Sequence, residues 1–123
     1  MGKKTILIVD DNQDAADSLA MLFEIKGHKV FTAYDAETGL ELAHQASPDV
    51  IIHDINLPQM NGYIAAGKLR QDPNCSAAIL VALTGYALPG DCQRALAAGF
   101  DFHMAKPLDF MVLKRILSPA GIL

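Results

Sequence analysis

The sequence predicts an α/β domain in which helices cover both faces of a parallel β-sheet. Three observations lead to this class. Short apolar runs that suit buried strands alternate with segments of helical periodicity, and the alternation continues along the whole 123-residue chain. Apolar residues make up 51% of the chain, which is enough for a substantial core. The alternation of strands and helices implies a parallel sheet between helical layers, and right-handed crossovers leave few possible topologies.

Five apolar runs are the predicted strands. Several are rich in β-branched residues, as expected of strands buried on both faces. They span residues 6–9, 30–33, 50–53, 79–83 and 100–104.

Helices are expected after each of these strands. We expect Asp14, Asp35 and Asp109 to cap the first, second and fifth helices, because a carboxylate accepts hydrogen bonds from first-turn amides. The first helix should pack through a stripe formed by Leu19, Leu22 and Phe23, and end at Gly27. The third and fourth helices are expected at 63–70 and 88–98, and the fifth should reach Leu117 before Ser118-Pro119.

Composition excludes several classes of protein. The net charge of −4 argues against nucleic-acid binding by charge, and no apolar run is long enough to span a bilayer. No signal peptide is recognisable, so we expect a cytoplasmic protein that forms one domain over 1–123. Cys75 and Cys92 match no metal-binding or redox motif, and we expect them to be free thiols in a reducing compartment.

Five polar residues follow or end predicted strands, and they mark the candidate site. They are Asp10, Asp11, Asp54, Thr84 and Lys106. In an open parallel sheet, ligands bind at the carboxyl ends of the strands, where these residues should gather. Carboxylates there suit Mg²⁺, and one of them can act as a nucleophile toward phosphorus. Lys106 would neutralise charge, and the Thr84 hydroxyl would hydrogen-bond a phosphoryl oxygen.

The motifs around these residues resemble the signature of the receiver domains of two-component response regulators. The resemblance covers nearly the whole chain. It rests on Asp10-Asp11, on Asp54 with 57–62 (Leu-Pro-Gln-Met-Asn-Gly), on 82–85 (Ala-Leu-Thr-Gly) and on Lys106-Pro107. It implies a flavodoxin-like (βα)5 fold with strand order 2-1-3-4-5. It also implies a switch that catalyses only its own phosphorylation and slow dephosphorylation.

The resemblance further implies roles for individual residues. Asp54 would accept a phosphoryl group from a phosphohistidine of a sensor histidine kinase or phosphotransfer protein. Asp11, Asp54 and the backbone carbonyl of Asn56 would hold Mg²⁺ directly, and Asp10 mainly through water. The Lys106–Pro107 bond is expected to be cis, which would aim the lysine at the phosphoryl group.

Four residues near the site depart from the family pattern or vary within it. His53 stands where an apolar residue is usual, and we interpret it as a hydrogen-bonded core histidine. His103 occupies the position of a mobile aromatic side chain, and a histidine there is expected to make the switch sensitive to pH. Asn56 and Tyr86 lie two residues after Asp54 and Thr84, at rim positions that would tune the lifetime of the phosphate.

Two other classes of protein share this topology. A flavin- or nucleotide-binding protein would need a Gly- or Ser/Thr-rich loop after the first strand, where this chain has Asp-Asp-Asn-Gln-Asp at 10–14. A phosphatase with an aspartyl nucleophile usually carries a second Asp two residues later, where this chain has Asn56, which cannot exchange a proton at neutral pH.

The last predicted helix carries more apolar residues than one stripe needs. They are Phe110, Met111, Val112, Leu113, Ile116 and Leu117. The excess fits either deeper packing or a surface for a partner or a second copy. We expect phosphorylation to act on a downstream protein target through the fourth helix, fifth strand and fifth helix.

Overall fold

The computed structural model describes residues 3–58, 60–85 and 90–118, in which strands and helices alternate. The strands are β1 (Thr5–Val9), β2 (Lys29–Ala33), β3 (Val50–Asp54), β4 (Ile79–Thr84) and β5 (Phe102–Ala105). The helices are α1 (Gln13–Ile25), α2 (Ala36–Ala46), α3 (Gly62–Gln71), α4 (Asp91–Ala98) and α5 (Phe110–Leu117). No helix in these ranges is both long and apolar enough to cross a bilayer.

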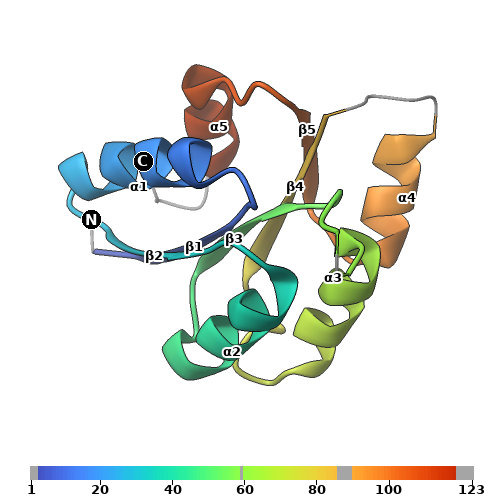
Figure 1. The fold of residues 1–123 in the computed structure, drawn as a ribbon. Helices are drawn as coiled ribbons and strands as arrows, with labels where there is room; N and C mark the ends of the chain where they lie inside the picture. The colour runs from blue at the N-terminus through green and yellow to red at the C-terminus, as the bar shows by residue number, and fades with distance from the viewer. Residues whose placement is uncertain (1–2, 59, 86–89, 119–123) are drawn as a thin grey trace.

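The strands form one parallel sheet in the order β2-β1-β3-β4-β5 (Figure 1). This confirms the predicted flavodoxin-like fold and its strand order. The register aligns the carboxyl ends of the central strands, since Val9 lies opposite His53 and Asp54 lies opposite Leu83. Residues that directly follow these positions therefore meet at one edge of the sheet.

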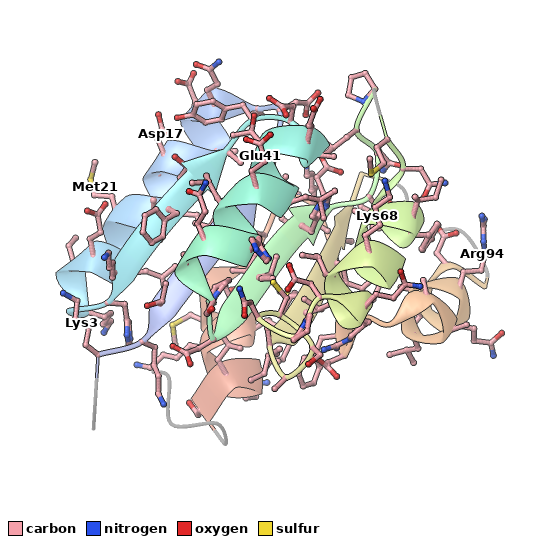
Figure 2. The ribbon with its side chains drawn as sticks, turned by 90° about the horizontal axis from the view of Figure 1, so that it is seen from below. Lys3, Asp17, Met21, Glu41, Lys68 and Arg94 are labelled. Atoms are coloured by element: carbon pink, nitrogen blue, oxygen red, sulfur yellow. The ribbon has the colours of Figure 1, made fainter. Side chains whose placement is uncertain are left out.

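Two apolar cores lie on the two faces of the sheet. Helices α1 and α5 cover one face, where the rings of Phe23 and Phe110 pack edge to face with centroids 5.7 Å apart. Helices α2, α3 and α4 cover the other face, over a core that includes Leu69 and Ala95. In Figure 2, charged side chains such as Glu41 on α2 project from the outer surface of this helical layer.

The start of α1 differs from the prediction. Asn12, not Asp14, caps the helix, and its side chain accepts a hydrogen bond from the Ala15 amide at 3.1 Å. The Asn12 amide donates to the Asp10 carboxylate at 3.0 Å, so the site itself fixes where the helix begins. Leu22, predicted to lie in the buried stripe, is 41% exposed. The buried face of α1 consists of Ala16, Leu19, Ala20 and Phe23.

The other element ends agree with the prediction in part. Asp35 and Asp109 cap α2 and α5 as predicted. Strand β5 begins two residues later than predicted, because the Phe100 amide donates to the Ala95 carbonyl and Phe100 belongs to the turn after α4. The described part of α4 begins at Asp91, whereas the predicted start at 88 lies outside the described residues, as does Pro119.

Gly62 is required for close packing and not for an unusual backbone conformation. Positive φ angles occur at Gly27, Gly90 and Gly99 among the described glycines, and not at Gly62. A Cβ at Gly62 would lie 2.5 Å from the Cα of Ile55. The glycine therefore lets the start of α3 pack directly against the main chain that follows Asp54.

Candidate functional site

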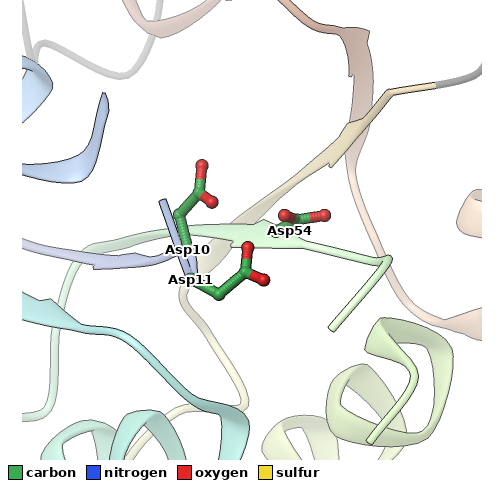
Figure 3. A group of neighbouring side chains, drawn as sticks. All are labelled: Asp10, Asp11 and Asp54. Carbon is green, nitrogen blue, oxygen red and sulfur yellow. The ribbon is translucent and has the colours of Figure 1, made fainter. Parts of the chain in front are cut away.

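Three carboxylates meet at the carboxyl ends of β1 and β3 (Figure 3). Asp10 and Asp11 directly follow β1, and Asp54 is the last residue of β3. One carboxylate oxygen from each residue lies within 4.8 Å of the other two. Asp10 and Asp54 are each only 3% exposed, whereas Asp11 is open to solvent. The sheet thus brings together the acidic residues that the sequence placed in two separate segments.

Lys106 joins this group from the end of β5. Its peptide bond to Pro107 is cis, as expected, and its amide donates to the Thr84 carbonyl at 2.7 Å. The Lys106 Nζ lies 2.7 Å from Asp54 Oδ2 and 3.2 Å from each carboxylate oxygen of Asp10. One ammonium group therefore contacts the acidic residues that end two neighbouring strands.

The pKa values of Asp10 and Lys106 are both shifted by their surroundings. Burial raises the pKa of Asp10, and the hydrogen bonds from the Asn12 amide and Lys106 offset this only in part. Burial alone would lower the pKa of Lys106, but its hydrogen bonds and charge attraction to Asp54 and Asp10 outweigh burial, so the pKa is raised. Lys106 is therefore an ammonium ion at neutral pH. The site thus combines three carboxyl groups with one ammonium group, a set that favours a bound cation.

Asn56 contacts the site with both its main chain and its side chain. Its amide N–H donates to Asp54 Oδ1 at 2.8 Å, and its side-chain Nδ2 donates to Thr84 Oγ1 at 3.2 Å. Asn56 therefore links the end of β3 to the end of β4. Sequence reasoning expected its backbone carbonyl and its rim position, but missed the contact between the side-chain amide and Thr84, for which the spacing gives no signal.

Two histidines lie beside the site on the α2–α4 side of the sheet. His53 is 1% exposed, and its Nδ1 lies 2.8 Å from the Asp54 carbonyl oxygen, which confirms the prediction of a hydrogen-bonded core histidine. His103 pairs with Ala82 on the neighbouring strand and is partly buried. Its role in a pH-sensitive switch stays a prediction. Tyr86 lies outside the described residues.

The oxygen atoms of the acidic cluster fit a bound Mg²⁺ ion. Mg²⁺ prefers carboxylate, carbonyl and water oxygens, and usually binds through one or two carboxylates together with waters and a phosphate oxygen. The cluster supplies three carboxylates in reach of one another, with one of them open to solvent. Thr84 and Lys106 add a hydroxyl and an ammonium at the same edge. The fold and site together define a class of protein, an α/β module whose acidic edge has the residues that suit a phosphoryl group and a divalent cation.

Comparisons with known proteins support the same conclusion. The model of the response regulator receiver domain matches residues 6–118. A 14.6 kDa protein of Leptolyngbya boryana is 33% identical over 95% of this chain and 89% of its own length. A receiver domain protein of Methanospirillum hungatei, described as CheY-like, is 29% identical, with a TM-score of 0.87 over 98% of this chain and 95% of that one.

A third relative has a metal in its site. The receiver domain of a sensor histidine kinase from Pseudomonas aeruginosa is 30% identical and covers 96% of this chain and 97% of that one, with a TM-score of 0.84. Its structure contains a magnesium ion coordinated in the active-site cleft.

The chain belongs to the response regulator receiver domain family. It is a phosphoacceptor signalling module of two-component systems, and it works as a switch and not as a turnover enzyme. The phosphatase and flavin- or nucleotide-binding alternatives are not favoured.

Proposed function

We propose that Asp54 is the phosphoacceptor and that a phosphohistidine of a sensor kinase or phosphotransfer protein is the donor. The observation that carries the proposal is the 2.7 Å contact between Lys106 Nζ and Asp54 Oδ2 inside the acidic cluster. An Asp54 oxygen attacks phosphorus, a P–O bond forms, the P–N bond to the donor imidazole breaks, and the imidazole leaves as a neutral ring once protonated. The domain, proposed to span 1–123, catalyses this step and slow dephosphorylation on itself.

Different residues of the site would hold the cation and stabilise the negative charge of the phosphoryl oxygens. Asp11, Asp54 and the Asn56 carbonyl would hold Mg²⁺ directly, with Asp10 acting mainly through water. When bound, the ion supplies positive charge beside the transferring group. Lys106 stays protonated and balances charge on the phosphoryl oxygens, and the Thr84 hydroxyl hydrogen-bonds one of them.

We further propose that the signal leaves through the surface of α4, β5 and α5. Large apolar side chains are exposed on all three elements, with Leu96 at 49%, Phe102 at 36%, Met111 at 65% and Val112 at 39%. Leu113 and Leu117 are buried on the core side of α5, and Phe110 and Ile116 pack against the same core, so Met111 and Val112 are surplus to its packing. This supports a surface for a downstream protein or a second copy of the chain.

Two free thiols, Cys75 and Cys92, agree with the proposed cytoplasmic location.

Incubation with a small phosphodonor tests the function. With acetyl phosphate and Mg²⁺, we expect incorporation to approach one phosphoryl group per chain. Asp54 is the proposed single nucleophile, and Asn56 cannot act as the acid/base that a phosphatase uses to release the product. Intact-mass spectrometry measures the incorporation. A phosphomonoester such as p-nitrophenyl phosphate should not be turned over steadily. Sustained release of nitrophenol by the purified protein would instead indicate the phosphatase.

Metal binding separates the roles of the two adjacent acids. Asp11→Ala should weaken Mg²⁺ binding by at least about tenfold, since losing even a supporting group of a metal site costs about 10–100-fold in affinity. Asp10→Ala should weaken it less, because Asp10 is expected to act through water. Calorimetric titration measures both, with Asp14→Ala as the control on the exposed first turn of α1. Unchanged affinity in both variants would move the ion away from the acid pair.

A further inference from the structure

The contact of His53 with Asp54 fixes how its imidazole is protonated. Nδ1 lies 2.8 Å from the Asp54 carbonyl oxygen, and a carbonyl oxygen only accepts hydrogen bonds. Nδ1 must therefore carry a proton. In a neutral ring, Nε2 then has a lone pair, and this atom is buried without a hydrogen-bond partner among the described residues.

The contact between His53 and Asp54 lies where the pairing of β1 with β3 ends. The pairing of β1 with β3 ends with Val9 opposite His53, whereas β4 continues the pairing of β3 to Asp54 through Leu83. Asp54 is therefore the strand residue that β1 no longer flanks. The His53 imidazole holds the Asp54 main chain at this point, where the ladder with β1 has stopped.

In the described part of the chain, three hydrogen bonds outside the β-ladder hold Asp54. The Asn56 amide donates to Oδ1, Lys106 donates to Oδ2, and His53 donates to the main-chain carbonyl. The first two contacts orient the carboxylate, and the third fixes the backbone from which the side chain projects. A residue that served the core alone would not bury a polar ring nitrogen without a hydrogen-bond partner, as His53 buries Nε2, since an apolar side chain of similar size avoids that cost.

We infer that His53 is a positioning residue for phosphoryl transfer, whose Nδ1–H holds the main chain of the phosphoacceptor in place. The inference rests on the proposed role of Asp54. His53 touches neither the donor nor the phosphoryl group and acts through Asp54. A misplacement of about 1 Å at a reacting group can cost about a hundredfold in rate, so partial loss of this anchor should cost about tenfold.

The first test reads the tautomer directly. In protein labelled with ¹⁵N-histidine, long-range ¹H–¹⁵N correlation at pH 7 distinguishes the protonated from the unprotonated ring nitrogen, and the His53→Leu spectrum identifies the His53 signals. We expect a proton on Nδ1, as the contact with the Asp54 carbonyl requires. A proton on Nε2 alone would overturn the inference. This result does not depend on whether Asp54 is the phosphoacceptor.

The second test asks whether the donor matters for the reaction. His53→Asn keeps an N–H near the position of Nδ1, and His53→Leu fills the space without a donor. At saturating Mg²⁺, acetyl phosphate should phosphorylate the Leu variant about tenfold more slowly than wild type, and the Asn variant within about threefold of it. Thermal unfolding checks that each variant is folded, and His53→Phe replaces the Leu variant if that one does not fold.

The outcomes separate this inference from the proposed function. Equal rates for the Leu variant and wild type, or an Asn variant as slow as the Leu variant, would make His53 a structural residue. If wild type itself took no phosphoryl group at Asp54, the proposed function would fail, while the tautomer result would still stand.

Discussion

Replacing Asp54 with asparagine is expected to reduce phosphorylation by at least about a thousandfold, to the background of the assay. The amide has nearly the same shape as the carboxylate and can still accept the Asn56 N–H that reaches Oδ1 at 2.8 Å. It has no negative oxygen to attack phosphorus, and it loses the ion pair with Lys106. The change therefore removes the nucleophile while it preserves the space that the nucleophile fills.

The measurement is incorporation of the phosphoryl group from acetyl phosphate, followed by intact-mass spectrometry. Asp14→Asn is the control, because Asp14 is an exposed carboxylate in the first turn of α1 and lies outside the acidic cluster. It should be phosphorylated at the wild-type rate. An Asp54→Asn protein that is folded and labelled at that same rate would assign the phosphoacceptor to another residue.

Gly62→Ala is expected to destabilise the fold by about 3 kcal/mol, at the upper end of the usual cost of overpacking. The new Cβ would lie 2.5 Å from Ile55 Cα and 2.7 Å from its Cγ2, and the first of these atoms is main chain that cannot rotate away. The backbone between Asp54 and α3 must shift, and the Gly62 amide that donates to the Ile55 carbonyl at 3.0 Å must move with it. Because Ile55 follows Asp54, Mg²⁺ affinity and phosphorylation should fall as well.

Gly67→Ala is the matched control within the same helix. A Cβ at Gly67 would have no atom within 4 Å, and alanine favours a helix interior over glycine by about 1 kcal/mol. Urea denaturation should therefore move the two variants in opposite directions from wild type. Equal stability of Gly62→Ala and Gly67→Ala would show that the approach of α3 to Ile55 imposes no constraint.

The kind of fold and the composition of the site were readable from the sequence. Three apolar runs, 6–9, 50–53 and 79–83, are directly followed by Asp10, Asp54 and Thr84, and parallel strands place those ends at one edge, so the sequence predicted that these residues meet there. The caps at Asp35 and Asp109 were also predicted, because capping depends on a few adjacent residues. These features are local, or they follow from the periodicity of the chain.

Other features depend on which distant atoms come together, and only the tertiary structure decided them. Asn12 caps α1 because its amide is held by Asp10. Leu22 is exposed because α1 packs on the sheet through the face that contains Leu19 and Phe23. Strand β5 begins after Phe100 because the Phe100 amide donates to the Ala95 carbonyl of α4. The sequence identified His53 as a hydrogen-bonded core residue, but not its partner, the Asp54 carbonyl, which lies beyond the last residue pair of the ladder between β1 and β3.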